Sequence, residues 1–397
     1  MADDARMIEA IIAAPDDDAP RRAYAEWLKA RGDPRGEFIE LQLKAAASPD
    51  GWRSEFAARD LRAAHGESWV PAIQGLSVTA FRRGFPESIF ISGDDFLDCV
   101  DAIFGTMPVR EVTLWGSAGT LERIVERPEL RRLRALSLSN EVTVEGLAAL
   151  AASPWVSELA SLSVDGVPIG DAGGAALAGG TALRRLSTLM LVNCGIGREG
   201  AESLAGSQIL GAVTYLNLSA NPLAAGTARV VASPYLARIE RLYLGKAGVD
   251  DAACAAIALA SGLSGLTELN LPDNRIRDEG AAALANSVNM PNLVRLRLSE
   301  NGIGDAGAAA FASAHGLPKL EVLDLSSNAI GEAGAEALAN GSGLPALKTL
   351  GLSYNPIYVP GATEEWKDWD GSSVGSGPVK VDTAELKVRY GQRFEIT

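Results

Sequence analysis

The feature that most constrains this fold is a sequence pattern that returns every 26 or 27 residues. Its clearest copy reads Leu-x-x-Leu-x-Leu-x-x-Asn, from Leu293 to Asn301. Because one copy cannot bury its apolar face alone, the copies must stack against one another. Nine copies begin at Leu133, Leu159, Leu186, Val213, Ile239, Leu266, Leu293, Leu320 and Leu347, and a weaker tenth covers Val109, Val112 and Leu114.

Each copy contains one strand segment and one helix segment. Leucines at the fourth and sixth positions alternate with other residues, which predicts a short strand with one buried face. An alanine-rich stretch follows, as in 305–312, and its acidic first residue suits the positive end of a helix dipole. Strands joined through helices run parallel, with right-handed crossovers. Since strands stack ~4.8 Å apart and helices ~8–10 Å apart, the array must bend. We therefore predict an α/β solenoid, a horseshoe with a concave parallel sheet and convex helices.

The repeat resembles the leucine-rich repeat, and its length resembles the ribonuclease-inhibitor-like subclass. The ninth position departs from Asn or Cys at Glu141, Val167 and Ala247, where we expect a different turn after the strand. Proteins of this subclass mainly bind other proteins, and some inhibit nucleases or activate small GTPases. The resemblance therefore implies a binding scaffold. Position nine is occupied elsewhere by Cys194, Asn221, Asn274, Asn301, Asn328 and Asn355.

Residues 1–44 follow no repeat and form a separate predicted module. The segments Asp17-Asp-Ala-Pro-Arg21 and Gly32-Asp-Pro-Arg-Gly-Glu-Phe38 resemble the bacterial repeat-companion domain, which implies an architecture and a bacterial source but no activity. Helices are predicted at 7–12 and 20–30, with a third opening near Phe38. The helical spacing of Tyr24, Trp27, Leu28 and Phe38 indicates core packing, and a docking surface is the alternative.

Both ends of the repeat array, placed at 109–358, need a cover for their apolar cross-sections. We assign 45–108 as the N-terminal cap, with helices at 55–65 and 96–104 and strands at 77–81 and 87–91. Arg82 and Arg83, between these strands, could bind an anion, but the favoured interpretation is that they cover a sheet edge or pair with nearby acids. We assign 359–397 as the C-terminal cap, with a flexible loop at 371–377. Its apolar residues are Trp366, Trp369, Val379, Val381, Leu386, Val388 and Tyr390.

The composition of the chain disfavours several classes of ligand and of catalytic site. With 50 acidic and 36 basic residues, the chain has a formal charge of −14, which disfavours binding to nucleic acid or to an anionic membrane. Three scattered cysteines and the lack of an apolar leader favour a cytoplasmic location. Only two histidines occur, and no phosphate-loop, nucleophile-elbow or His-Glu-x-x-His motif is present. We predict no catalytic residue, cofactor or metal site, and a monomer is favoured.

A surface remains as the predicted site. The third, fifth and seventh residues of each repeat should point onto the concave face, where most are small or polar. Tyrosine and arginine are enriched in binding hot spots. The alternative is that these side chains only cover the sheet. We predict that another, unidentified protein binds there, and regulation of a nuclease or GTPase is the alternative function. The predicted partner-binding residues are Met190, Val192, Tyr215, Arg241, Tyr243, Lys246, Arg295 and Arg297.

Overall fold

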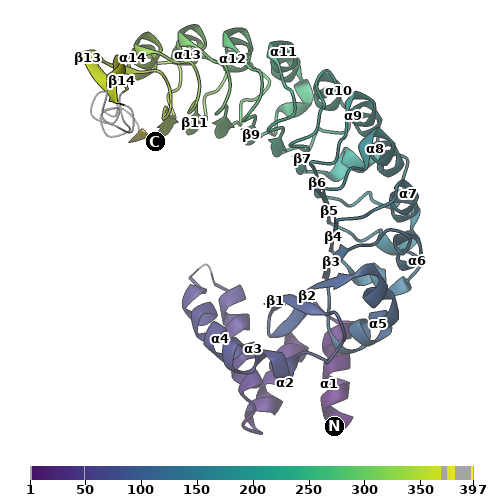
Figure 1. Cartoon of the computed structure of the whole chain (residues 1–397). Helices are drawn as coiled ribbons and strands as arrows, with labels where there is room; N and C mark the ends of the chain where they lie inside the picture. Colours follow the sequence, from purple (N-terminus) through teal and green to yellow (C-terminus); the bar gives the residue numbers. More distant parts are fainter. Residues whose placement is uncertain (1, 49, 368–372, 381–394, 397) are drawn as a thin grey trace. The chain divides into compact units, whose positions relative to one another are not determined.

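The computed structural model describes residues 2–48, 50–367, 373–380 and 395–396. The chain forms two compact units, Met1–Asp165 (unit 1) and Gly166–Thr397 (unit 2). Each unit combines strands with helices in the α/β arrangement that the repeat predicts (Figure 1). No helix in the described part of the chain has both the length and the apolar composition needed to cross a bilayer.

Unit 1 begins with four helices and continues into the first repeats. The helices and strands expected between residues 7 and 104 are all present, although α1 begins five residues earlier than expected and the third helix opens at Pro34 and not near Phe38. The helices are α1 (Ala2–Ala13), α2 (Asp18–Lys29), α3 (Pro34–Ala46), α4 (Trp52–His65), α5 (Gly93–Thr106), α6 (Leu121–Ile124) and α7 (Val144–Ala152). The strands are β1 (Ser77–Arg82), β2 (Phe85–Ser92), β3 (Glu111–Trp115), β4 (Ala135–Ser139) and β5 (Ser161–Asp165).

The sheet of unit 1 starts with an antiparallel hairpin and then becomes parallel. Strand β1 pairs antiparallel with β2, and β2, β3, β4 and β5 follow in parallel register. The hairpin turn uses left-handed backbone at Arg83 (φ 50°) and Gly84 (φ 88°). A Cβ on Gly84 would lie 2.3 Å from Ile39 Cγ1 of α3, so glycine lets the turn approach the helices. The turn is thereby packed against the helical module.

The aromatic side chains of the N-terminal helices are core residues, as predicted. Tyr24, Leu28 and Phe38 are buried, and Trp27 is partly buried against them. Phe85 of β2 joins the same cluster as Tyr24. Phe38 lies in a second cluster, against which Phe81 of β1 packs, so the helical module and the first hairpin share both apolar clusters.

Arg82 and Arg83 pair with acids, which confirms the favoured reading. Arg82 Nη2 lies 2.9 Å from Glu111 Oε1, and Arg83 Nη2 lies 3.4 Å from Glu87 Oε1. The fully buried Arg21, from the segment that resembles the companion domain, donates to the same Glu87 oxygen at 2.7 Å. The Arg21–Glu87 contact thus joins α2 to β2, and Arg82 joins the hairpin to β3.

Unit 2 continues the repeats with one strand and one helix in each. Its helices are α8 (Gly170–Ala178), α9 (Arg198–Ala205), α10 (Gly226–Val231), α11 (Asp251–Leu259), α12 (Asp278–Ala285), α13 (Asp305–Ala312) and α14 (Glu332–Asn340). The parallel strands are β6 (Thr188–Val192), β7 (Tyr215–Asn217), β8 (Arg241–Tyr243), β9 (Glu268–Asn270), β10 (Arg295–Arg297), β11 (Val322–Asp324) and β12 (Thr349–Gly351).

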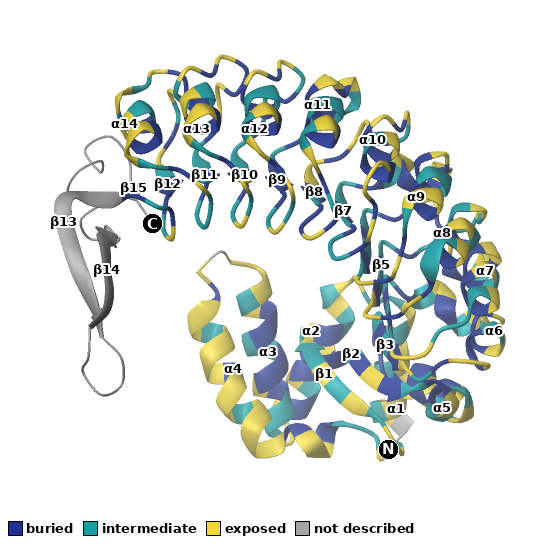
Figure 2. Cartoon of the chain, turned by 45° about the horizontal axis from the view of Figure 1, so that its top comes forward, coloured by how far each residue is buried: buried dark blue, intermediate teal, exposed yellow. Residues whose placement is uncertain are grey.

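Within unit 2 the strands line the inner side of an arc and the helices line its outer side (Figure 1). Figure 2 shows the buried positions gathered between the two layers, where the repeat leucines lie. Leu269, Leu296 and Leu323, at the fourth position of successive repeats, are each 0% exposed and adjacent in register. The leucines therefore form a continuous ladder, and the sheet face opposite them points away from the core.

The C-terminal segment forms a hairpin of β13 (Tyr358–Lys367) and β14 (Ser373–Lys380), while the short β15 (Glu395–Ile396) pairs with β12. Residues 373–377 belong to β14, so the predicted loop at 371–377 is wrong over that part because the segment pairs with β13. Trp369, Val381, Leu386, Val388 and Tyr390 lie outside the described residues.

The repeat asparagines join neighbouring repeats. Asn301 Oδ1 accepts from the N–H of Ile276 in the preceding repeat (3.1 Å), and its Nδ2 donates to Leu271 O of that repeat (3.0 Å). The same amide donates to Leu298 O of its own strand (3.0 Å). The departure at Ala247 does not change the left-handed eighth position, since Lys246 has φ 54° and Glu300 has φ 55°. The tenth position does differ, because Gly248 after Ala247 is left-handed (φ 72°) whereas Gly302 after Asn301 is not, so the turn departs there as expected.

An aspartate at the start of one helix caps the next helix. Asp278 Oδ1 accepts from Gly304 N–H (2.7 Å) and Gly307 N–H (2.9 Å) at the start of α13. A Cβ on Gly307 would stand 2.8 Å from that oxygen, so the glycine makes room for the carboxylate. The Asp-x-Gly motif therefore recurs because the aspartate of one repeat contacts the glycine of the next. Asp171, Asp251 and Asp305 cap the following helices in the same way.

We predict that Asn301→Ala lowers the free energy of unfolding by roughly 1–3 kcal/mol, because backbone groups of two repeats lose their partner. Urea denaturation measures the loss. As the control, alanine at the exposed Asn286, the C-cap residue that follows α12, should change the free energy of unfolding by less than about 0.5 kcal/mol. Equal effects of the two substitutions would contradict the assigned role.

A double-mutant cycle tests the aspartate cap. We predict that Gly307→Ala and Asp278→Ala each cost ~0.5–2 kcal/mol, although alanine favours a helix, because either change removes the same cap. The double variant should then lose less than the sum of the two. Gly302→Ala is the matched control, because its added Cβ meets nothing closer than 3.5 Å. Strict additivity would show that the aspartate and the glycine act separately.

Candidate partner-binding face

The register of the strands in unit 2 places the predicted site residues in two rows. Tyr215, Arg241, Glu268 and Arg295 occupy equivalent positions on β7, β8, β9 and β10. The second row lies two residues further along each strand. It contains Met190, Asn217, Tyr243, Asn270, Arg297 and Asp324. Neighbouring strands lie about 4.8 Å apart, so side chains in one row can touch.

Two tyrosines and an arginine form one stack on β7 and β8. The Tyr215 and Tyr243 ring centroids lie 5.0 Å apart, and the planes are tilted by 33°. The Arg241 guanidinium carbon lies 4.8 Å from the Tyr215 centroid. Among the described residues, no carboxylate lies within ion-pair distance of Arg241. The guanidinium group of Arg241 makes a cation–π contact with Tyr215 and remains exposed on the surface.

A buried carboxylate organises the other half of the face. Glu268 is only 5% exposed, although its strand position points away from the leucine core. Its carboxylate lies 3.2 Å from Arg295 Nε and 3.9 Å from Arg297 Nη1, and it accepts a hydrogen bond from the Tyr243 hydroxyl. Since both arginines are nearly half exposed, Glu268 fixes their inner parts and leaves their outer edges open.

Burial raises the pKa of Tyr243 to about 12, and the hydrogen bond to Glu268 adds to the effect. The phenol therefore stays protonated at neutral pH and serves as a donor. Glu268 consequently has a partner on each side, with Tyr243 on β8 and the two arginines on β10. Glu268 thus links side chains of three neighbouring strands.

The structure brings together five of the eight predicted residues, and three lie outside this group. Met190 is separated from Tyr243 by Asn217, and Val192 lies further along β6. Lys246 lies in the left-handed turn after β8, where it contacts Asp273 at 3.8 Å. The structure adds Glu268, which the sequence placed on this face without a role. We call Tyr215, Arg241, Tyr243, Glu268, Arg295 and Arg297 the central cluster.

No group of three His, Cys, Asp or Glu side chains in the described part of the chain could hold a metal ion. Cys194 and Cys254 are buried, and burial raises the pKa of the Cys254 thiol. His65 lies against Trp69, with ring centroids 6.0 Å apart. The central cluster itself can donate hydrogen bonds and attract anions, which are properties of a binding surface.

Comparisons with known proteins agree with the repeat assignment. Residues 265–285 and 291–357 match models of the leucine-rich repeat, so the chain carries these repeats. No curated protein matches the sequence. Among solved structures, an internalin (inlF) from Listeria monocytogenes is 20% identical with a TM-score of 0.41, over 63% of this chain and 68% of that one. Listeria monocytogenes InlP is 17% identical with a TM-score of 0.39, over 58% of each chain. At these values the two likenesses carry no argument about function.

The tie between Tyr243 and Glu268 has a consequence at alkaline pH. A tyrosine whose pKa is raised to about 12 on folding contributes stability below pH ~10 and loses it as the pH rises toward 12. We therefore predict that wild type exceeds Tyr243→Phe in stability at pH 8 and that the difference shrinks above pH ~10, as measured by urea denaturation.

Removing the charge of Glu268 provides the control. Glu268→Gln should lower the pKa of Tyr243. Phenolate absorbance measures this pKa, once the titration curve of a variant that also carries Tyr243→Phe has been subtracted. An unchanged Tyr243 titration in Glu268→Gln would contradict the hydrogen bond between the two side chains.

Proposed function

We propose that this protein is a non-catalytic scaffold that binds another protein on the sheet face of unit 2, at the central cluster. The observation that carries the proposal is the buried Glu268. It holds Tyr243, Arg295 and Arg297 in place while their polar ends remain accessible. A side chain that is already ordered loses little conformational entropy on binding, so such residues suit a hot spot.

The charge pattern favours a protein over a nucleic acid or a lipid surface. The central cluster has three arginines and one carboxylate, a local excess of two positive charges on a chain of net charge −14. The rest of an acidic molecule would repel an extended phosphate backbone or an anionic membrane. A folded protein needs to contact only the cluster and its rim, which include Met190, Val192 and Lys246.

Further parts of the proposal rest on the sequence. The period of 26 or 27 residues supports the ribonuclease-inhibitor-like subclass, and the segments around Arg21 and Phe38 support a bacterial repeat-companion domain at 1–44. We propose a cytoplasmic location because the three cysteines are all free thiols. A nuclease or small GTPase as the captured partner would make the scaffold a regulator.

Alanine substitution of the cluster tests the proposal on the full-length chain. A partner is first captured from cell extract, identified by mass spectrometry and purified. We predict that Tyr215→Ala, Arg241→Ala and Tyr243→Ala together raise Kd by about thirtyfold or more, which corresponds to ~2 kcal/mol. The exposed Arg241 contributes little to folding, so its single variant should keep wild-type stability within about ±0.5 kcal/mol.

The matched controls lie on the outer helices. Glu279→Ala on α12 and Glu336→Ala on α14 are exposed and should leave Kd unchanged. Normal affinity of the cluster variant, together with weakened binding by the controls, would move the site to the helical face.

A further inference from the structure

Unit 1 carries a separate exposed aromatic surface on α4. Trp52 is 64% exposed and Phe56 is 56% exposed, and the two lie one helical turn apart. The only buried residue of α4 is Ala58. Large aromatic side chains that remain exposed together are typical of an interaction site, whereas scattered single ones are not. The packing of unit 1 does not explain why these two face solvent.

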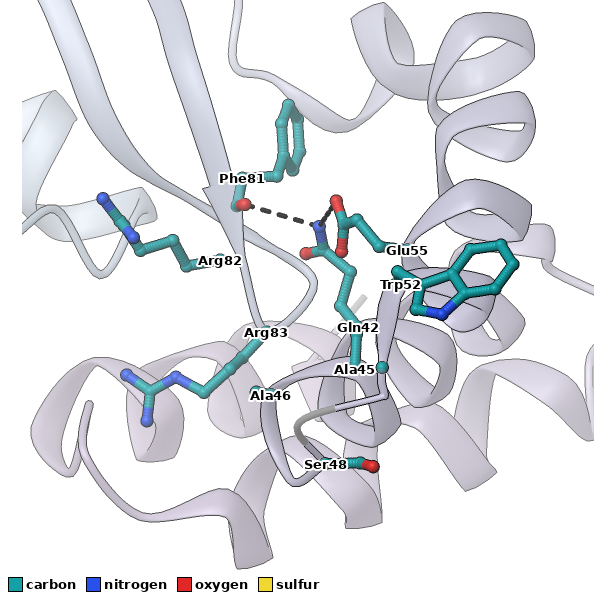
Figure 3. A pocket seen from close by; sticks show the side chains of 10 residues that line it. Gln42, Ala45, Ala46, Ser48, Trp52, Glu55, Phe81, Arg82 and Arg83 are labelled. Atoms are coloured by element: carbon teal, nitrogen blue, oxygen red, sulfur yellow. Dashed lines mark hydrogen bonds between the residues drawn. The ribbon is translucent and has the colours of Figure 1, made fainter. Parts of the chain in front are cut away.

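A groove runs beside these aromatic residues. One cavity of about 520 Å³ lies between α3 and α4 and is lined by Phe38, Gln42, Trp52 and Phe56. Another of about 520 Å³ extends toward the β1–β2 turn and shares Gln42, Trp52 and Glu55 with the first (Figure 3). The Gln42 amide donates to Glu55 Oε1 and to Phe81 O, both at 3.4 Å, and so connects α3 to α4 and to β1 between the two cavities. Because they share these residues, the two cavities form one groove along α4.

Arginines lie over aromatic rings of α4 and β1, and of these Arg59 and Arg62 line the groove while Arg53 lies beside it. The guanidinium carbon of Arg53 lies 5.2 Å from the Trp52 ring centroid, and that of Arg59 lies 4.2 Å from the Phe56 centroid. Arg62 lies 5.7 Å from the Phe81 centroid in the same way. A cationic ligand would have to displace these groups. A stacked guanidinium keeps its N–H edge free, and that edge matches a carboxylate.

The charges of α4 point to the same class of ligand. Its three arginines outnumber Glu55 and Asp60, so the helix is locally basic on an acidic chain. Arg59 lies 3.6 Å from Asp60, and both are well exposed, so that pair is weak. In the described part of the chain, Arg53 and Arg62 have no carboxylate within ion-pair distance. Two guanidinium groups beside an exposed apolar surface are therefore able to pair with the carboxylates of a ligand.

We propose that the groove along α4 binds a peptide segment of another protein that combines apolar and acidic residues. Its apolar side chains pack on Trp52 and Phe56, and its carboxylates pair with Arg53 and Arg62. This site is independent of the central cluster, because it uses other residues in the other unit.

Three labelled peptides test the proposal on the full-length protein by fluorescence anisotropy. Each is an amphipathic helix with leucines on one face, and the other face carries only Glu, only Gln or only Lys. We expect the Glu peptide to bind at least about tenfold more tightly than the Lys peptide, with a preference that weakens as salt is added. Trp52→Ala with Phe56→Ala should reduce binding of the Glu peptide about tenfold or more. Arg53→Gln with Arg62→Gln should remove the preference for Glu over Gln.

The controls separate this site from the sheet face of unit 2. Leu259→Ala removes a 78% exposed apolar side chain elsewhere, and Arg198→Gln removes an exposed charge on α9; neither should alter binding. Thermal melts establish that the α4 variants remain folded. Equal affinity for the Glu and Lys peptides, or no binding of the Glu peptide, would overturn the proposal. Loss of binding in Arg241→Ala but not in the Trp52 and Phe56 variant would also overturn it, because the peptide would then bind the central cluster.

Discussion

Polar side chains that cross from one repeat to the next are the contacts on which the repeats depend. The leucine ladder supplies apolar burial, but leucines alone fix neither the spacing nor the turn between repeats. Asn301 bonds backbone groups of two repeats at the end of their strands, and Asp278 closes the start of the following helix. One face of each repeat is therefore held at two separate points. In an array whose units contact only their neighbours, such bonds determine how each unit is placed.

The residues that hold the repeats together lie mostly in the core, the turns and the helix ends, so the outward face of the sheet is available for contacts with other molecules. Leucines fill the space between strands and helices, while the repeat asparagines and aspartates bind the turns and helix ends. Some outward strand residues also bind backbone, since Asn217 and Asp324 accept hydrogen bonds from the residues just after their strands. Along most strands the outward residues are small or polar. At the central cluster they are large, and Glu268 lies beneath them with almost no exposed surface. Burying a carboxylate between two arginines and a tyrosine costs desolvation, so stability alone does not account for this arrangement.

Much of this could be predicted from the sequence, because the repeat fixes the spacing of every strand and helix. The ranges of α1 to α5 and the alternation of buried and exposed strand residues followed from local patterns. The burial of Glu268 could not be predicted, because it depends on how side chains from β8 and β10 fold over β9. Lys246 lies beside the strand in a left-handed turn, which could not be predicted because the same turn position is occupied elsewhere by residues as different as Asp273 and Tyr354. The pattern also revealed the aspartates without revealing that each caps the next helix.

Site-specific photocrosslinking tests the central claim most directly. A photoreactive phenylalanine is placed at Met190 or Ser326, which flank the central cluster, or at Glu279 or Glu336 on the outer helices. The account predicts that irradiation in cells joins one protein partner to the chain from the two sheet positions and gives no adduct from the helix positions. Adducts from the helix positions alone would contradict it and would place the partner on the opposite face of the repeats.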